Sequence, residues 1–429
     1  MSSRAKIRSF LIPAVFALTI GIAEPLHADP RTNPRFNMSS VFVRGTFTYD
    51  WPDGSGGDLS YGGSALGVSE DGDFLYVACN IGSARRGIAK LRIPAIGQMA
   101  QVVAPCQGPD FNELLKILPS NDGGQLTLGG VLEQGGRVVV TGFASYDANG
   151  VTSASHWSGT SLTALTGPWA GRFTSGVLAN QVRTGLVKSQ MGVIPTEWQP
   201  LLGGPAFSTA GYTSIISRQS CGAALSVFDP ATVTSNNFPM NFLLGCPHWL
   251  SGCNTWTSWG PSTNGFEGAE LAAGAFIVPG TRTLVVIERE GSGGDCYGYT
   301  TTNQSLHGQP YPSPEGVRYC YSLSDPMDQK GNKAYPYRLV AKNYDLNELY
   351  DVKLGNRQPT SVKQYETVNL PGSSASEFVM SGAYNPVRGE FYLLRGAGGG
   401  VNTVHVYGGF SHSSSSNPAP AAPMNLRVP

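Results

Sequence analysis

Hydrophobic and polar residues along this chain recur as pairs of short apolar segments separated by tight turns. In each pair, a segment of small apolar residues leads through a Gly- or Pro-bearing turn into a strongly β-branched or aromatic segment. The pairs are Leu66–Val68 with Phe74–Val77, Leu128–Leu132 with Arg137–Thr141, Ala273–Val278 with Arg282–Ile287, and Met380–Tyr384 with Glu390–Leu394. Loosely repeated β-hairpins of this kind are typical of a radial β array, above all a β-propeller.

The two ends of the pattern indicate how such a ring closes. The last module contains three strands, Val379–Tyr384, Phe391–Arg395 and Thr403–Tyr407, and Val41–Tyr49 alternates as a strand near the start of the chain. Because an unpaired sheet edge invites aggregation, we expect Val41–Tyr49 to supply the fourth strand of the last blade. The predicted fold is all-β: one β-propeller over residues 41–408, with about seven blades, although six or eight also fit. An open sandwich with independent termini is the alternative.

Helices and long loops interrupt the strands. Asp345 and Glu348 form a capping box that predicts a helix over Leu346–Leu354, with Gly355 placed to end it. Residues 195–202 (PTEWQPLL) suit one or two helical turns. Residues 246–268 and 291–335 are predicted to be long loops, and loops carry function on such scaffolds.

The chain ends differ in composition from the rest. Residues 1–28 have a basic start, an apolar run from Phe10 to Ala23 and a small-residue site at Ala28, as a secretory signal peptide does. A retained membrane anchor is the weaker alternative. Residues 409–429 form a Ser- and Pro-rich linker, predicted to be disordered, whose last residues resemble the first strand of a fibronectin III-like domain.

Charge excludes some partners. Lys plus Arg and Asp plus Glu each number 29, and charged residues make up only 14% of the chain. Loss of the signal segment removes three basic residues and one acidic residue, so the remainder stays close to neutral. Such a chain has no basic field for nucleic acid or for an anionic membrane. No later segment is apolar enough to span a bilayer, so we expect a secreted, periplasmic or cell-surface protein that is a monomer.

Seven cysteines follow the predicted signal segment, which suits an oxidising compartment. The favoured disulfide pairs leave Cys221 free, although six cysteines alone allow 15 pairings. Those pairs are Cys79 with Cys106, Cys246 with Cys253, and Cys296 with Cys320. The alternative is that most of these cysteines are reduced and buried.

Several stretches resemble a group of exported bacterial proteins of β-propeller-like architecture to which no activity is assigned. These stretches are PTEWQPLLGGPAF (195–207), GDCYGY (294–299), GVRYCY (316–321), AYPYRL (334–339) and YDLNELYDVKLGNRQP (344–359). The resemblance covers the middle and C-terminal half. It implies an exported bacterial propeller and transfers no catalytic residues.

Compact catalytic motifs are absent from the sequence. It contains no GxSxG elbow, HExxH, CxxC or P-loop, and no Asp-box or Trp-Asp repeat. These absences favour a non-catalytic protein without excluding an enzyme, because a propeller site is built from scattered blade ends. No cofactor is expected. Structural calcium at Asp53 and Asp58, or at Asp147 and Asn149, remains an alternative to ordinary turns.

A metal site at Cys246, His248 and Cys253 is disfavoured, because a fourth ligand is not visible nearby. The segment that follows these residues is the main candidate for binding. Trp249, Trp256 and Trp259 are followed by Glu267 and Glu270, and aromatic rings beside carboxylates can stack on sugars and bind their hydroxyls. The competing interpretation is that these rings pack the loop against the body of the protein.

Three functions fit this pattern. The first is an exported binding or scaffold propeller that engages a glycan or an extracellular protein at the cell surface through its long loops. The second is a glycoside hydrolase or lyase that uses Glu267 or Glu270 with channel-facing residues. The third is a structural spacer in a surface protein. Glu288 and Glu290 alternate on one strand and are predicted to form an exposed face.

Overall fold

The structure is a computed structural model. It describes residues 28–50, 66–81, 85–108, 126–144, 146–147, 152–210, 215–216, 223–245, 271–293, 296–325, 327, 330–373, 378–396 and 402–410. Strands dominate this part of the chain, so the all-β prediction is confirmed. Two α-helices are described, α2 (Gln199–Leu202) and α4 (Leu346–Lys353). Short 3₁₀ turns lie at Pro30–Thr32, Met38–Ser40, Leu162–Ala164, Gly176–Leu178, Thr184–Leu186, Pro230–Thr232, Gln304–Leu306 and Pro359–Ser361.

Five sheets of four or five strands make up the body, and four of them are antiparallel throughout. The first contains β2 (Leu66–Val68), β3 (Phe74–Ile81), β4 (Arg85–Arg92) and β5 (Gln101–Gln107). The second contains β6 (Leu126–Gln134), β7 (Arg137–Ala144), β9 (His156–Gly159) and β10 (Thr166–Trp169). The third contains β12 (Met191–Val193), β13 (Ala206–Ser208), β15 (Leu225–Phe228), β16 (Phe238–Leu244) and the parallel strand β11 (Gly171–Phe173).

The last two sheets follow the same plan. The fourth contains β17 (Leu271–Ile277), β18 (Thr283–Gly291), β22 (Tyr337–Asp345) and β23 (Glu366–Asn369). The fifth contains β24 (Phe378–Asn385), β25 (Glu390–Gly396), β26 (Asn402–Gly408) and β1 (Phe42–Tyr49). A two-stranded pair, β8 (Tyr146–Asp147) with β14 (Ile215–Ile216), lies outside these sheets.

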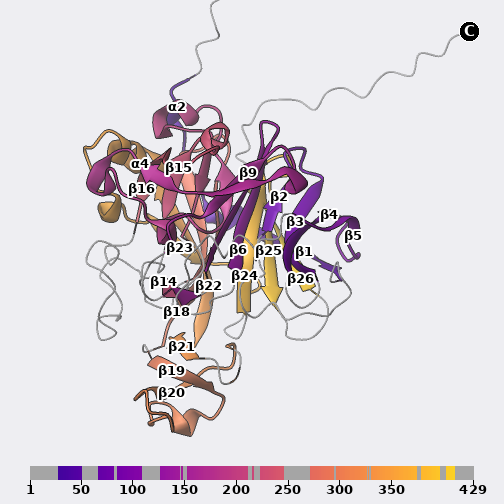
Figure 1. Ribbon diagram of the computed structural model, residues 1–429, viewed down its shortest axis with the longest axis vertical. Coiled ribbons are helices and arrows are strands. Elements are labelled where there is room, and N and C mark those ends of the chain that lie inside the picture. The colour runs from indigo at the N-terminus through magenta and orange to yellow at the C-terminus, as the bar shows by residue number, and fades with distance from the viewer. Residues whose placement is uncertain are drawn as a thin grey trace, which may run out of the picture.

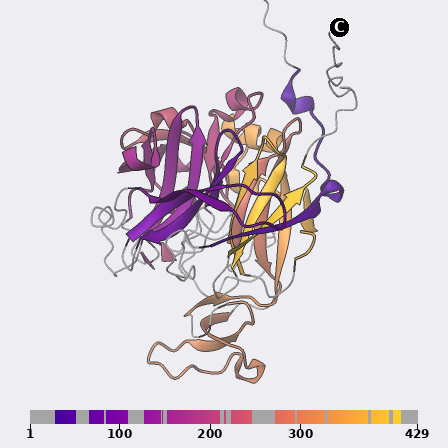
Figure 2. The same cartoon turned by 90° about the vertical axis from the view of Figure 1, so that its right-hand side faces the viewer.

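The contacts between the sheets run around a ring; Figures 1 and 2 show the body of the protein from two sides. The leading strands β2, β6, β12, β17 and β24 each contact the next, and β24 also contacts β2. This is a propeller-like arrangement. The described residues form five such sheets, so the predicted number of about seven blades is not confirmed.

Glycine allows the leading strands to approach this closely. A Cβ on Gly67 in β2 would lie 2.2 Å from the carbonyl oxygen of Val131 in β6. A Cβ on Gly129 in β6 would lie 1.9 Å from the carbonyl oxygen of Lys188, just before β12. The small residues of the sequence pattern therefore have a physical cause, since side chains at these positions would hold the strands apart.

The N-terminal strand closes the ring, as predicted. β1 pairs with β26 along its length, from Phe42 opposite Gly408 to Tyr49 opposite Asn402. The same strand reaches the first sheet, where Thr48 N donates to Gln98 O (3.1 Å) and Ala100 N donates to Thr48 O (2.7 Å). The alternative of independent termini is therefore wrong.

The hydrophobic core is divided among the spaces between neighbouring sheets. Because side chains alternate between the two faces of a strand, each sheet contributes to two of these spaces. In β18, for example, Leu284 and Val286 pack toward the third sheet, whereas Val285 and Ile287 pack toward the fifth. The core thus runs around the ring and is completed only when β1 is in place.

Helix α4 begins where the sequence predicted. The Asp345 carboxylate accepts a hydrogen bond from Asn347 N (3.0 Å), as an N-cap residue does. Gly355 adopts a positive φ of 78° just after the helix, which favours glycine. Asp345 also pairs with Arg35 (2.8 Å) and Arg282 (3.3 Å), so this cap ties the N-terminal segment to the fourth sheet.

Residues 291–335 correct one prediction, because this segment is not a plain loop. It carries a sheet of its own, made of β19 (Cys296–Thr301), β20 (Arg318–Tyr321) and β21 (Lys330–Lys333), which projects from the body in Figures 1 and 2. A disulfide joins Cys296 to Cys320 within it, and another joins Cys79 to Cys106 in the first sheet. Two of the three predicted disulfide pairs are therefore confirmed.

Buried polar contacts fix the projecting sheet to the body. Arg289 Nη1 lies 3.3 Å from Asp325 Oδ1, and the Tyr337 hydroxyl donates to Asp325 Oδ2 (2.9 Å). Burial would raise the pKa of Asp325, but Arg289, Lys333 and two hydroxyl donors outweigh burial and lower it. The carboxylate therefore stays charged and anchors the base of this sheet.

Glu288 and Glu290 correct another prediction. They do not form an exposed face, because both are buried and paired. Glu288 Oε2 lies 2.8 Å from Lys342 Nζ, and Glu290 Oε2 lies 2.9 Å from Arg338 Nη2.

Among the described residues, no helix is long and apolar enough to cross a membrane.

Candidate functional site

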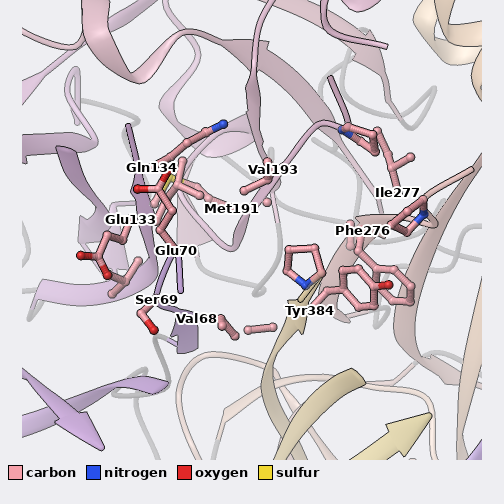
Figure 3. A pocket seen from close by; sticks show the side chains of 18 residues that line it. Val68, Ser69, Glu70, Glu133, Gln134, Met191, Val193, Phe276, Ile277 and Tyr384 are labelled. Atoms are coloured by element: carbon pink, nitrogen blue, oxygen red, sulfur yellow. The ribbon is translucent and has the colours of Figure 1, made fainter. Parts of the chain in front are cut away.

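A cavity of ≈ 340 Å³ lies on the axis of the ring, at the ends of the leading strands. Each of the five sheets contributes lining residues from the end of its leading strand and the turn that follows. Glu70, Glu133, Val193, Ile277 and Tyr384 represent the five sheets in that order, and Figure 3 shows them around the cavity. The site therefore exists only when the ring is closed.

One wall of the cavity is polar and acidic. Glu70, Glu133 and Gln134 lie together on one side in Figure 3. Glu133 Oε2 accepts a hydrogen bond from the Tyr76 hydroxyl (2.6 Å), and Glu70 Oε1 accepts one from Gly135 N (3.1 Å). These bonds orient both carboxylates, one in the turn after β2 and one at the end of β6.

Burial, and then the hydrogen bond to Glu133, raise the pKa of the Tyr76 hydroxyl well above its ordinary value. Tyr76 is therefore a proton donor at neutral pH, and Glu133 is its acceptor. Lys90 lies near the same carboxylate, with Nζ 4.0 Å from Glu133 Oε2. Lys90 also stands over the rings of Phe74 (4.5 Å) and Tyr76 (5.2 Å), outside the cavity lining.

The opposite wall is aromatic and apolar. Tyr384 is half-buried, and its ring stacks on the buried ring of Phe276 at 4.4 Å with an interplanar angle of 12°. The Tyr384 hydroxyl donates to the carbonyl oxygen of Phe410 (3.3 Å), which fixes the ring further. Pro279 and Pro386 also line the cavity. This wall is a rigid apolar surface opposite two carboxylates (Figure 3).

The inner end of the cavity is closed by side chains. Gln190 precedes the lining residue Met191, and Ser381 lies two residues before the lining residue Ala383; the two side chains meet across the axis, where Gln190 Nε2 donates to Ser381 Oγ (3.3 Å). Both Gln190 and Ser381 are buried. The cavity is therefore blind at this level of the axis.

The structure does not place the predicted binding residues. Trp249, Trp256, Trp259, Glu267 and Glu270 lie outside the described residues, as do Cys246 and Cys253. The predicted signal segment through residue 27, the tail beyond residue 410, Asp53, Asp58 and Asn149 also lie outside, and Asp147 is described only as part of β8.

Sequence reasoning missed Glu70 and Glu133. Glu70 stands in the SEDGD turn and Glu133 at the end of β6, in the segment EQGG, and the sequence pattern predicts only a turn at each. Their equivalent positions in successive modules were the available signal, because equivalent turns of a radial array meet at one face.

Comparisons with known proteins give only distant similarity. No family model matches the chain, and no curated protein matches it. Among solved structures, a GH43 β-1,3-galactosidase with galactodeoxynojirimycin has a TM-score of 0.40 at 9% identity, covering 83% of this chain and 92% of that one. A mannose phosphorylase from Leishmania mexicana, in complex with phosphate, has a TM-score of 0.35 at 10% identity, covering 85% and 88%.

The catalytic domain of a GH62 α-L-arabinofuranosidase from Coprinopsis cinerea has a TM-score of 0.29 at 10% identity, covering 86% of this chain and 98% of that one. At these identities, the activities of the three proteins do not carry over to this chain.

Proposed function

We propose that the chain is a five-bladed β-propeller that binds the end of a glycan in its axial cavity. The observation that carries this proposal is the pairing of two walls across the cavity. Tyr384 offers a rigid aromatic surface on one side, and Glu70 and Glu133 offer hydrogen-bond acceptors on the other. Sugars present an apolar ring face and a rim of hydroxyl donors, so they match both walls.

The size of the cavity limits the ligand. A volume of ≈ 340 Å³ lies at the lower end of the roughly 300–1,000 Å³ that small-molecule sites occupy. The blind inner end prevents a chain from threading along the axis. The proposed ligand is therefore a short terminal unit of a glycan, one or two sugars long. Such a ligand suits an exported protein, and the two disulfides are consistent with an oxidising compartment.

A blocked cavity tests the proposal. Val193 lines the mouth with 36% of its surface exposed, so Val193→Trp should fill the opening without disturbing the core. Val177 has a similar exposure of 39% and does not line the cavity, so Val177→Trp is the matched control. On a glycan array, we expect the wild type and Val177→Trp to bind the same terminal sugars and Val193→Trp to lose them. An identical profile for all three proteins would contradict the proposal.

Glycoside hydrolysis is the second candidate, because two carboxylates share the acidic wall. Hydrolases of this type use a pair of carboxyl groups, one as acid and one as base or nucleophile. Aryl glycosides that match the sugars found on the array would report turnover directly. If the wild type releases the aryl group and both Glu70→Gln and Glu133→Gln lose this activity, the protein is a hydrolase. If the wild type binds the sugars but releases no aryl group, it is a binding protein.

The hypothesis that the segment 246–268 binds a ligand is a separate proposal. If the segment 246–268 engages a glycan or an extracellular protein, Trp256→Ala with Trp259→Ala should change the array or pull-down profile. Unchanged profiles would remove that segment from consideration. The spacer hypothesis is favoured only if neither the cavity nor the segment 246–268 binds a ligand.

A further inference from the structure

We infer that the axial cavity prefers sugars that carry a free amine, and disfavours sugars that carry a carboxylate or sulfate. This inference rests on the proposed carbohydrate binding and specifies its ligand class. It follows from the sign of the charges around the cavity and from the carboxylate oxygens that remain available there.

Every charged side chain that lines the cavity is acidic. Glu70 and Glu133 are the charged members of the lining, and the remaining lining residues are neutral. A bound ammonium group would lie near both carboxylates, whereas an anionic sugar would meet like charge at short range. Opposite charges attract and like charges repel in this partly enclosed setting more strongly than in open water.

Each carboxylate keeps one oxygen for a ligand. Glu133 uses Oε2 for Tyr76, and Glu70 uses Oε1 for Gly135. Within the described part of the chain, no donor is placed on Glu133 Oε1 or on Glu70 Oε2. An ammonium group has three donors, so it can donate to a carboxylate oxygen of the wall and still serve two further acceptors, including water.

Lys90 weakens this preference without reversing it. Its ammonium lies 4.0 Å from Glu133 Oε2, beyond hydrogen-bond distance, and on the side of the rings of Phe74 and Tyr76. Glu70 has no ion-pair partner among the described residues. Even if Lys90 fully neutralised Glu133, the wall would keep the negative charge of Glu70.

The preference should be moderate and should depend on salt. Partly exposed ion pairs contribute up to about 1 kcal/mol, which corresponds to about a fivefold change in Kd for one pair. With two carboxylates, we expect an amine to improve Kd about three- to tenfold over its N-acetyl counterpart at low salt. Because salt screens exposed charges, the difference should shrink toward physiological ionic strength and above.

Matched sugar pairs test the inference by isothermal titration calorimetry. The probes are the disaccharide of β-1,4-linked glucosamine against its di-N-acetyl form, and galactosamine against N-acetylgalactosamine. Measurements at about pH 6 keep the amines protonated. The wild type should bind at least one amine form more tightly, and Glu70→Gln with Glu133→Gln should bring each pair close to equality. Glu70 is exposed, so Glu70→Gln alone is a second variant that leaves the fold intact.

The outcomes separate this inference from the function on which it rests. Equal or tighter binding of the N-acetyl forms, a preference that survives in the double variant, or no binding of either amine would overturn the amine preference. The proposed glycan binding would still stand in those cases if neutral sugars bind the wild type and not Val193→Trp. Loss of all sugar binding would overturn both.

Discussion

The buried ion pair between Glu288 and Lys342 allows a stringent test of the packing around the ring. Glu288 on β18 and Lys342 on β22 are diagonal neighbours, because Glu288 lies opposite Val340 in the strand register. Their side chains are 0% and 1% exposed, and Oε2 lies 2.8 Å from Nζ. Each charge therefore depends on the other, since neither has access to water.

Removal of one partner should cost more than removal of both. Lys342→Met leaves the Glu288 carboxylate buried without its cation, which destabilises a protein by about 3–5 kcal/mol. A domain is stable by only about 5–15 kcal/mol, so this single change should remove a third or more of the total. In the double variant Glu288→Leu with Lys342→Met, apolar groups replace both charges, and the cost should be close to zero or reversed.

Urea unfolding with intact disulfides measures these free energies. We expect Lys342→Met and Glu288→Leu each to lower the midpoint strongly and the double variant to recover most of the loss, giving a coupling energy of at least about 2 kcal/mol. Lys363 is exposed, and Lys363→Met should leave the midpoint unchanged. Single variants that cost less than about 1 kcal/mol, or a double variant as unstable as the sum of the two, would refute the reasoning.

Three further changes test the ring, its histidine and its projecting sheet. Gly67→Ala should cost about 1–3 kcal/mol in urea unfolding, because the new Cβ would lie 2.2 Å from a backbone oxygen, while Gly331→Ala meets no atom closer than 3.4 Å and should be nearly neutral. Burial lowers the pKa of His156 to about 3, so the unfolded chain binds more protons between about pH 6.5 and that value. Stability should therefore fall as the pH is lowered across this window, by up to about 1.4 kcal/mol per pH unit, and a profile as steep in His156→Gln would contradict this. Serine at both Cys296 and Cys320, which are 24 residues apart, should destabilise the projecting sheet by about 3–4 kcal/mol, and unchanged proteolysis within residues 296–333 would show the bond to be unimportant there.

Much of the fold could be predicted from local patterns. The small residues of Leu66–Val68 and Leu128–Leu132 marked leading strands, because close strand contact leaves room only for small side chains. The alternation in Val41–Tyr49 and the three-stranded last module together predicted the closing strand. The helix after Asp345 followed from capping chemistry, which acts within a few residues.

The blade number was not predictable in the same way. The prediction of about seven blades used the usual number for the fold. In this chain, however, some segments form no blade, for example the projecting sheet within residues 291–335. The leading strand of the third sheet, Met191–Val193, has only three residues, and its outer strand Gly171–Phe173 comes earlier in the chain. A hydrophobic periodicity cannot be detected in three residues. The sequence near Gly171–Phe173 also gives no sign that this strand pairs in parallel with β16, which comes much later in the chain.

The cavity could not be predicted from the sequence either. Its lining residues come from the ends of five strands and the turns after them, which together span more than 300 residues of the chain, from Val68 to Pro386. Glu70 and Tyr384 face the same space only after the ring closes. The buried pairs of Glu288 and Glu290 show the same limit. Their alternation along β18 correctly predicted that the two side chains share one face of the strand. It could not predict that this face is buried, because their partners Lys342 and Arg338 lie on another strand, β22.

The filled axis makes the two ends of the ring thermodynamically separate. Gln190 meets Ser381 between them, so a ligand in the cavity cannot contact residues beyond that level. Two sites are coupled only if a ligand at one changes the state of the other, and a rigid, packed ring offers no second state. We therefore expect serine at both Cys296 and Cys320, in the projecting sheet at the opposite end, to leave the Kd of a cavity sugar unchanged within twofold, about 0.4 kcal/mol. If these changes at the opposite end weaken the sugar tenfold while Val177→Trp does not, the axis cannot be the rigid partition that the Gln190–Ser381 contact implies.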